Sequence, residues 1–341
     1  MKKKKYLVTG GTGFIGSALV KRLIQENFDV RVFDNNLRGH VARLTDIKDE
    51  IEYIQGDITS LDDVLRACQG IDSVIHLAYL NGTEFFYTKP HLVLEIGVKG
   101  IVNVLDACRD NGIKELILAS SSEVYQEPKN IPTDERVAYS IPDPLNPRYS
   151  YAGGKIISEL MVINYGRHFF DRAIIFRPHN VYGPDMGHEH VIPQLVQKIM
   201  NLSTHHNSNG ISLPIQGSGQ ETRSFIFIHD FIEGLISILM KGRHLEIYNI
   251  GTQDEVTIKH LAETMGKLMH KNILIQTGVK KQGSAARRCP DITKIKNLGF
   301  EPKFSLEQGL LHTIPWYKEI YMQKEENSFK RSEIYEQSRT E

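Results

Sequence analysis

Tyr151 and Lys155 are the residues whose types and spacing point most directly to acid–base chemistry. In the run Tyr-Ala-Gly-Gly-Lys they stand four residues apart, which places both side chains on one face of a helix. A nearby ammonium favours tyrosinate and so lowers the pKa of the phenol. The pair therefore predicts a base that takes a proton from a substrate hydroxyl group.

A glycine-rich turn near the N-terminus predicts a site for a dinucleotide. Gly10, Gly13 and Gly16 follow the apolar run 6–9 and precede a helix-like segment. Such glycines permit a tight turn, a close approach of the backbone to a pyrophosphate, and close packing of helix on strand. The N–H groups at the start of the helix would then face the phosphates.

A carboxylate at the end of the next expected strand indicates which dinucleotide binds. Asp34 stands 18 residues after Gly16, where a ribose 2′-hydroxyl is usually held. Its charge would repel a 2′-phosphate, so the sequence favours NAD over NADP, although the cation Arg38 lies nearby in sequence. Asp57, at the end of the third expected strand, is placed to meet the adenine.

The elements that must position these residues alternate along the first half of the chain. Short, continuously apolar runs lie near residues 6–9, 30–33, 52–55, 73–77, 115–119 and 173–176. Helix-like segments lie between them, near 14–26, 61–68, 91–110 and 149–168. Continuous apolar strands are typical of a parallel sheet covered on both faces. The alternation therefore predicts a doubly wound α/β sheet.

The expected organisation is a dinucleotide-binding domain over residues 1–177 and a smaller substrate lobe mainly over 178–322. Elements near 224–257 are expected to return to the first domain, so that the lobe is interleaved with it. Further helices are expected near 229–241, 258–270 and 305–320, and a loop over 203–219. Residues 323–341 are charged and poor in apolar side chains, which predicts a frayed tail.

Composition argues against several classes of function. Lys plus Arg and Asp plus Glu both number 41, so no net charge draws the chain to nucleic acid or to an anionic membrane. Three scattered cysteines are too few for a disulfide framework, and nothing suggests a metal site. No apolar run reaches the roughly 18 residues of a membrane span. The sequence therefore predicts a cytoplasmic protein.

Together the motifs resemble the extended short-chain dehydrogenase/reductase family, in its nucleotide-sugar epimerase and dehydratase branch. The matching residues are Gly10, Gly13, Gly16, Asp34, Gly56, Asp57, Tyr151, Lys155, His229 and Asp230, and the runs 76–78, 120–125, 177–184, 220–225, 288–292 and 298–302. The resemblance implies a Rossmann-type sheet, NAD as cofactor and a nucleotide-diphosphate sugar as substrate. It also implies a homodimer in which helices near 91–110 and 149–168 form a four-helix seam.

The resemblance also implies roles for single residues. Tyr151 would be the base, Lys155 would position Tyr151 and the nicotinamide ribose, and Ser121 would hydrogen-bond the sugar's 4-oxygen. The implied cofactor-binding residues are Gly10, Gly13, Phe14, Ile15, Gly16, Asp34, Asp57, Ile58, Leu77, Ala78, Tyr151 and Lys155. Asn180, Arg223 and Arg288 would hold the diphosphate, and Thr83 lies in a segment, 81–87, that is expected to line the sugar pocket.

Two stretches depart from the family pattern. Gly97-Val-Lys-Gly100 stands where the family often has Asn-Val-x-Gly. The helix entry before the tyrosine is also altered, to Tyr-Ser-Tyr-Ala-Gly-Gly over residues 149–154. These departures predict a changed floor of the active site, with the cofactor and the catalytic pair retained.

Glu123 bears on the choice between the branches of the family, all of which begin by oxidising sugar C4. Simple 4-epimerases usually have a small uncharged residue there, whereas the run Ser121-Ser-Glu123 resembles the Thr-Ser-Glu of GDP-mannose 4,6-dehydratases and UDP-glucuronate decarboxylases. We expect a dehydratase-type step in which Glu123 removes the proton at C5. A glucose-type dehydratase is less well supported, because those enzymes carry aspartate at the position of Ser122.

Other functions stay open at this point. A 4-epimerase and a UDP-glucuronate-type decarboxylase are alternatives within the same chemistry, and the alternative role of Glu123 is only to orient its loop. A dehydrogenase would release the ketone together with NADH. A non-catalytic NAD-binding sensor is disfavoured because Tyr151 and Lys155 are both present.

Overall fold

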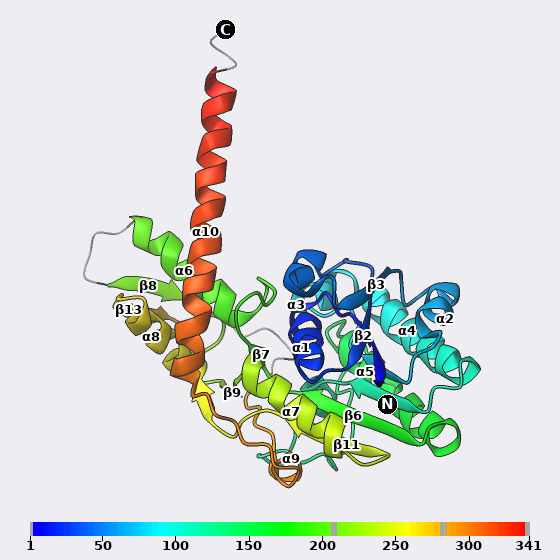
Figure 1. The fold of residues 1–341 in the computed structure, drawn as a ribbon. Coiled ribbons are helices and arrows are strands. Elements are labelled where there is room, and N and C mark those ends of the chain that lie inside the picture. The colour runs from blue at the N-terminus through cyan, green and yellow to red at the C-terminus, as the bar shows by residue number, and fades with distance from the viewer. Residues whose placement is uncertain (1–2, 206–209, 280–282, 284, 338–341) are drawn as a thin grey trace. The chain divides into compact units, whose positions relative to one another are not determined.

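The computed structural model describes residues 3–205, 210–279, 283 and 285–337, and the chain divides into two compact units (Figure 1). Unit 1 consists of Met1–Val181, Thr222–Glu255 and Gly283–Lys303. Unit 2 consists of Tyr182–Glu221, Val256–Gln282 and Phe304–Glu341. The chain therefore leaves unit 1 and returns to it twice, which brings the segment around Arg288 into the same unit as the N-terminal strands.

Unit 1 is built on a seven-stranded sheet with the spatial order β11-β6-β5-β4-β1-β2-β3, in which every pairing is parallel. Its strands are β1 (Lys5–Thr9), β2 (Asp29–Asp34), β3 (Ile51–Gln55), β4 (Ser73–His76), β5 (Glu115–Ala119), β6 (Arg172–Pro178) and β11 (Glu246–Ile250). The order reverses between β1 and β4, and ligands bind in doubly wound sheets beyond the carboxyl ends of strands at such a reversal. The predicted doubly wound sheet is confirmed.

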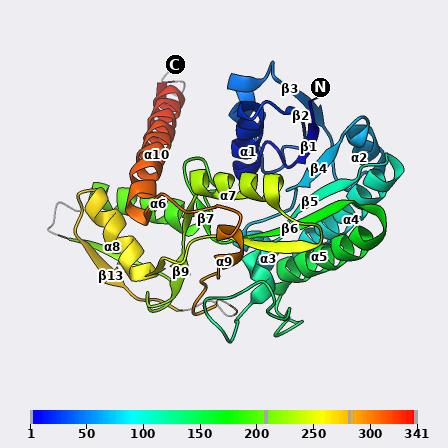
Figure 2. The ribbon, with the colours of Figure 1, turned by 60° about the horizontal axis from the view of Figure 1, so that its bottom comes forward.

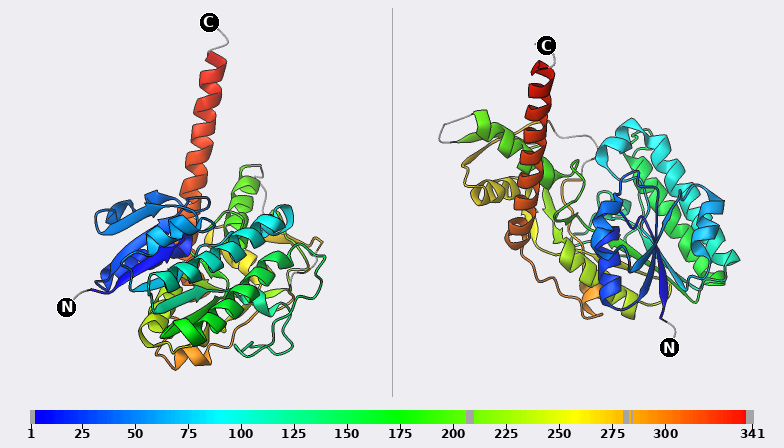
Figure 3. Two further views of the ribbon diagram at one scale, coloured as in Figure 1. Left: turned by 90° about the vertical axis from the view of Figure 1, so that its right-hand side faces the viewer. Right: turned by 45° about the horizontal axis from the view of Figure 1, so that its top comes forward.

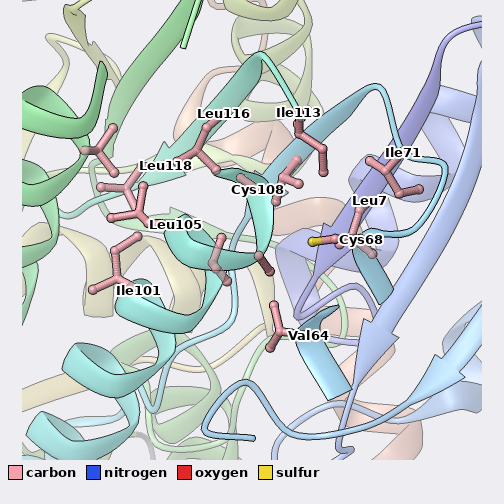
Figure 4. Close-up of a cluster of buried hydrophobic side chains, with 14 of the residues drawn as sticks. Leu7, Val64, Cys68, Ile71, Ile101, Leu105, Cys108, Ile113, Leu116 and Leu118 are labelled. Carbon is pink, nitrogen blue, oxygen red and sulfur yellow. The ribbon is translucent and has the colours of Figure 1, made fainter. Parts of the chain in front are cut away.

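Helices cover both faces of this sheet, as Figures 2 and 3 show. α1 (Phe14–Gln25) and α7 (Ile228–Lys241) lie on one face, and α2 (Leu61–Cys68), α4 (Pro90–Asp110) and α5 (Tyr149–Phe169) lie on the other. Ile101 and Leu105 of α4 pack with Leu116 and Leu118 of β5 in a buried cluster (Figure 4). Burying a side chain of this size contributes roughly 1.5–3 kcal/mol. The cluster thereby fixes the strand ends from which the site residues project.

Short elements complete unit 1. They are η1 (Val41–Ile47), α3 (Thr83–Thr88), η2 (Ser122–Tyr125), β9 (Thr222–Ser224), β10 (Ile226–Phe227) and α9 (Thr293–Lys296), while β7 (Val181–Tyr182) and β12 (Glu255–Thr257) lie where the chain passes between units. No helix is predicted over 81–87 from the sequence, yet α3 forms there. Its Phe86 is buried in an apolar cluster with Leu80, so tertiary packing stabilises the short helix.

Unit 2 contains α6 (Val191–His205), α8 (Ile258–Leu268), α10 (Leu306–Gln337) and a parallel pair of strands, β8 (Ile211–Pro214) and β13 (Ile273–Gln276). The sequence predicted α8 but not α6. The expected end of the last helix near residue 320 is wrong, because α10 (red in Figure 1) continues to Gln337. Residues 323–337 are rich in Lys, Glu and Gln, which have high helix propensity and extend a helix that has already formed. None of the described helices is long and apolar enough to cross a membrane.

Candidate functional site

The turn between β1 and α1 has a geometry that only glycine fits. Gly10 has a φ of 71°, and a Cβ there would lie 2.8 Å from the backbone nitrogen of Ala78. A Cβ on Gly16 would lie 2.1 Å from the carbonyl oxygen of Gly10. Gly13 is the N-cap of α1, and no side chain caps this N-terminus, which continues with Phe14 and Ile15. Its N–H groups are therefore placed to receive an anion such as a pyrophosphate.

Asp34 ties the end of β2 to this turn. Its carboxylate accepts hydrogen bonds from the backbone N–H of Thr12 at 3.0 Å and of Asn36 at 2.9 Å. Arg38, the cation that could have favoured a 2′-phosphate, donates to the carbonyl oxygen of Asn81. Its guanidinium also lies 5.3 Å from the centre of the Phe85 ring.

Asp57 orders the loop that follows β3. Its carboxylate accepts from the N–H and hydroxyl of Thr59, both at 2.8 Å, and from Asn35 at 2.9 Å. Burial raises the pKa of Asp57, but these hydrogen bonds outweigh burial and lower the pKa overall. The neighbouring Ile58 is buried and lies against Gly100 of α4. The contact of Asp57 with the adenine stays a prediction.

Thr9 anchors the loop after β4 to β1. Its hydroxyl shares a 2.8 Å hydrogen bond with Nδ1 of His76 and accepts from the N–H of Leu77 at 3.2 Å and of Ala78 at 3.3 Å. Burial lowers the pKa of His76 to about 3, and the charge of Lys155 acts in the same direction. The imidazole is therefore neutral at physiological pH.

Helix α5 brings Tyr151 and Lys155 together in a buried environment. The Lys155 ammonium lies 5.8 Å from the centre of the Tyr151 ring and donates to the carbonyl oxygen of Ala119 at 2.7 Å. Burial lowers the pKa of Lys155 to about 7, against the charge of Glu159. Burial also raises the pKa of Tyr151, and a hydrogen bond with Ser121 opposes this. Burial has the larger effect, so the pKa of the Tyr151 phenol is raised overall in this structure.

Ser121 follows β5 and caps the short helix η2. Its hydroxyl accepts from the N–H of Glu123 at 3.2 Å. The same side chain lowers the pKa of the Tyr151 phenol, so Ser121 lies between the phenol and the start of the Glu123 segment. The residues that the sequence singled out after β5 and on α5 are therefore neighbours in space.

Glu123 is held by arginines. Arg288 donates to its two carboxylate oxygens at 2.7 and 3.2 Å, and Arg148 approaches one of them at 3.4 Å. Burial raises the pKa of Glu123, but the charges of Arg288, Arg148 and Arg223 outweigh burial and lower the pKa to about 2. Because a carboxylate with such a pKa is a weak base, the ion pairs weaken the expectation that Glu123 removes the C5 proton.

The three residues expected to hold a diphosphate meet around Ser224. Asn180, with a φ of 39°, donates from Nδ2 to the carbonyl oxygen of Ser224 at 3.0 Å. The N–H of Ser224 donates to the carbonyl oxygen of Arg288 at 3.2 Å, and Arg223 immediately precedes it in the chain. Thr83, half-buried, begins α3. All of the candidate residues lie in unit 1.

Sequence reasoning missed two side chains of this site. Arg148 directly precedes α5, and Tyr79 meets the Tyr151 ring edge-on at 5.1 Å. Neither belongs to a spacing pattern, so only the tertiary fold reveals them. Phe86, which stacks on the Tyr151 ring at 4.7 Å, lies in the segment 81–87 that was expected to line the sugar pocket. Within the described part of the chain, no group of three or more His, Cys, Asp or Glu is placed to hold a metal ion.

Comparison with known proteins gives consistent matches over most of the chain. The NAD dependent epimerase/dehydratase family matches residues 6–251. The chain is 32% identical over 330 residues to the UDP-N-acetyl-alpha-D-glucosaminuronate decarboxylase of Bacillus cytotoxicus, covering 93% of this chain and 99% of that protein. It is 33% identical over 310 residues to UDP-glucuronic acid decarboxylase 6 of Arabidopsis thaliana, covering 90% and 86%. Among solved structures, the chain resembles the dTDP-glucose 4,6-dehydratase DesIV of Streptomyces venezuelae, which has NAD bound. The TM-score is 0.81 and the identity 28%, and the match covers 92% of this chain and 97% of that one.

Proposed function

Because this chain belongs to the NAD-dependent epimerase/dehydratase family, we propose that it decarboxylates a nucleotide-diphosphate sugar that carries a C6 carboxylate. The observation that carries the proposal is the arginine-bound state of Glu123. The decarboxylases among the curated relatives support it. Because these relatives are enzymes, they speak against a non-catalytic sensor.

NAD is the cofactor of this family, and the residues of unit 1 fit it. A Cβ would fill the cradle at Gly10 and Gly16, the N-terminus of α1 is uncapped, and Asp34 stands beside the turn. When bound, NAD supplies a reversible oxidant for sugar C4, so no net oxidation of the sugar is required. The resemblance read from the sequence motifs is confirmed, as is the cofactor.

Three side chains handle the proton of the sugar's 4-hydroxyl in this proposal. Tyr151 takes that proton and later returns it, while Ser121 hydrogen-bonds the same oxygen. Lys155 places a positive charge beside the phenol, which favours tyrosinate. With a pKa of about 7, Lys155 carries this charge in about half of the molecules at neutral pH.

Decarboxylation suits a Glu123 that is a weak base. In a 4-keto sugar with a C6 carboxylate, the C5–C6 bond breaks, CO2 leaves, and the electron pair remains as the enolate of the ketone until C5 is protonated. No base at C5 is needed, whereas dehydration requires one. Arg148 and Arg288 each keep a buried Nε without a hydrogen-bond partner, and guanidinium groups of this kind bind carboxylates well.

Turnover of UDP-glucuronic acid in heavy water tests the proposal. The expected result is release of CO2, a UDP-pentose with one deuterium at C5, and no lasting NADH fluorescence. A 6-deoxy-4-keto product from a UDP-, GDP- or dTDP-hexose would instead establish dehydration. Interconversion of 4-epimers without deuterium at C5 would establish epimerisation, and lasting NADH fluorescence a dehydrogenase.

Tyr151→Phe tests the roles assigned to the residues. The variant is expected to retain NAD and to lose turnover, because the ring stays and only the proton-transferring hydroxyl is removed. Near-wild-type turnover by Tyr151→Phe would overturn the mechanism whichever substrate is used.

We also propose a homodimer whose seam is formed by α4 and α5. These helices pack side by side, and they leave Leu94, Ile157 and Leu160 exposed to 37, 39 and 45%. Light scattering after size exclusion tests this state. Leu160→Glu is expected to give a monomer, whereas a wild-type monomer would contradict the proposal.

The cytoplasm is our proposed location. Cys68, Cys108 and Cys289 are free and buried, as in proteins of reducing compartments. Fractionation of cells that express the tagged chain tests this, and recovery in a secreted fraction would contradict it.

A further inference from the structure

Tyr79 contacts both members of the proposed catalytic pair, although no sequence motif contains it. The Lys155 ammonium lies 4.0 Å from the centre of the Tyr79 ring, closer than the 5.8 Å to the ring of Tyr151. The rings of Tyr79 and Tyr151 meet at 82° with their centres 5.1 Å apart. The Tyr79 ring therefore offers the ammonium a cation–π contact.

The hydroxyl of Tyr79 is buried without a hydrogen-bond partner and lies in a notch formed by Gly97 of α4 and Gly154 of α5. A Cβ on Gly97 would lie 2.1 Å from this hydroxyl oxygen and 2.3 Å from Cζ of the ring. A Cβ on Gly154 would lie 2.0 Å from the oxygen but 3.3 Å from Cζ. The ring and the hydroxyl of Tyr79 therefore both exclude a Cβ on Gly97, whereas only the hydroxyl excludes a Cβ on Gly154.

The notch accounts for two departures from the family pattern. Gly97 stands where the family often has asparagine, and Gly154 lies in the altered helix entry. Glycine inside a helix is unfavourable relative to alanine. Neither helix gains from its glycine locally, so the gain must come from the side chain that the glycines admit.

We propose that Tyr79 is a positioning residue: the notch of Gly97 and Gly154 fixes its ring, and the ring holds the Lys155 ammonium beside Tyr151. The importance of this contact for turnover rests on the proposed function, whereas the notch does not depend on it.

The other charged or titratable groups that face Lys155 do not replace this contact. Glu159, one turn along α5, favours the ammonium but is already paired with Arg177. His76 of β4 is neutral, and the pKa of the Tyr151 phenol is raised by burial. The ring of Tyr79, 4.0 Å from the ammonium, is therefore the contact that can stabilise the charged form of Lys155 against its burial.

Thermal unfolding of combined variants tests the notch. Gly154→Ala is expected to lower the Tm of the wild type, and to leave unchanged or raise the Tm of Tyr79→Phe, which lacks only the hydroxyl. Gly97→Ala is expected to lower the Tm in both backgrounds, because Cζ of the ring remains 2.3 Å from the added Cβ. It is expected to be tolerated only with Tyr79→Leu. If Tyr79→Phe does not restore the Tm lost in Gly154→Ala, the proposal that Gly154 accommodates the Tyr79 hydroxyl is wrong.

Gly153→Ala is the matched control for these substitutions. A Cβ on Gly153 of the same helix would meet only Ile141, at 4.0 Å. It is therefore expected to raise the Tm in every background through helix propensity alone. A Tm lowered by Gly153→Ala would mean that alanine disturbs this helix for reasons unrelated to Tyr79, and would overturn the assignment.

Carbon-13 NMR of protein labelled at lysine Cε and loaded with NAD tests the positioning. Lys155 is expected to titrate near pH 7, away from other lysines, and its signal is identified by its absence in Lys155→Met. Tyr79→Phe keeps the ring and the pKa, whereas Tyr79→Leu lowers the pKa by about 0.5–1 unit. Equal pKa values in all three proteins, or equal shifts in both variants, would overturn the proposal. Failure of the proposed function would show only in the substrate assay, since neither experiment here uses substrate.

Discussion

Two arginine–carboxylate clusters of unit 1 are built from the same residue types but differ in how fully their hydrogen-bond donors are used. In one, Arg177 of β6 faces Glu159 of α5. In the other, Arg288 and Arg148 face Glu123. The difference supports the proposal that the second cluster receives a ligand, whereas the first holds the fold together.

The Arg177 cluster is closed. The side chains of Arg177 and Glu159 are exposed to only 1% and 0%. Two of the arginine's N–H groups donate to Glu159, at 2.9 and 2.6 Å. The other three donate to Tyr125, to the carbonyl oxygen of Glu135 and to Tyr139, at 2.7, 3.1 and 3.3 Å. All five donors of the guanidinium are thus used, and none is left for a ligand.

The Glu123 cluster is open by comparison. Its side chains are exposed to 8% at Arg288, 11% at Arg148 and 18% at Glu123. The Nε groups of both arginines are buried without a hydrogen-bond partner. A buried donor without a partner costs about 1–3 kcal/mol, so such donors persist most readily where a ligand supplies the acceptor. The unused Nε groups of Arg148 and Arg288 therefore support the proposal that this cluster binds the substrate.

Breaking the closed cluster is expected to have the largest effect. Arg177→Met leaves Glu159 buried without its cation and should lower the free energy of unfolding by roughly 3–5 kcal/mol, as measured by urea denaturation. Arg109→Met is the control, because Arg109 pairs with Asp106 on the surface and should unfold like the wild type. Equal losses in both variants would show that burial does not distinguish the pairs.

Breaking the open cluster should lower activity strongly and stability only modestly. Arg288→Met removes the proposed charge-assisted hydrogen bonds to the substrate, worth about 1.5–3 kcal/mol, which corresponds to a roughly 10–150-fold lower kcat/KM on UDP-glucuronic acid. Its loss of stability should be smaller than that of Arg177→Met, because the carboxylate it leaves without its cation is less buried than that of Glu159. The adjacent Arg287 pairs with Glu255 on the surface, so Arg287→Met should leave turnover unchanged. An equal loss in Arg287→Met would contradict a specific role for Arg288.

The pH dependence of stability should report the arginines around Glu123. Its pKa falls from 4.5 in the unfolded chain to about 2 in the folded protein, so its ionisation stabilises the fold fully above about pH 4.5. This stabilisation is lost as the pH falls through about 2. The difference in unfolding free energy between wild type and Glu123→Gln should therefore shrink by roughly 1–3 kcal/mol between pH 6 and pH 2.5. A difference independent of pH would mean that the arginines do not hold the carboxylate ionised.

Local signals explain why most of unit 1 could be predicted from sequence. Each apolar run of β1 to β6, and each helix period of α1, α2, α4 and α5, lies within one short stretch of sequence. The structure matches these elements within about one or two residues. α6 was missed because it follows a loop-like segment without a helix start signal. The continuation of α10 is not predicted, because a charged segment poor in apolar side chains is also typical of a frayed tail.

The site divides in the same way. Tyr151 and Lys155 are four residues apart and the glycine turn spans seven residues, so both are visible in the sequence. Glu123 and Arg288 are 165 residues apart, and no local pattern predicts that they pair. The pairing changes the chemistry expected of Glu123 from a base at C5 to a partner of arginines. The notch around Tyr79 likewise depends on three segments that meet only in the fold.

Arg148 contributes little to the fold, so its substitution should separate ligand binding from stability. Arg148 approaches Glu123 at only 3.4 Å, so Arg148→Met should change the free energy of unfolding by less than about 0.5 kcal/mol. If its unused Nε serves the substrate carboxylate, stabilisation by UDP-glucuronic acid should fall in this variant, whereas stabilisation by UDP, which lacks that carboxylate, should not. Thermal shifts with both ligands measure this difference. Equal losses with both ligands would place Arg148 at the diphosphate. No loss with either ligand would show that Arg148, like Arg177, does not bind the ligand.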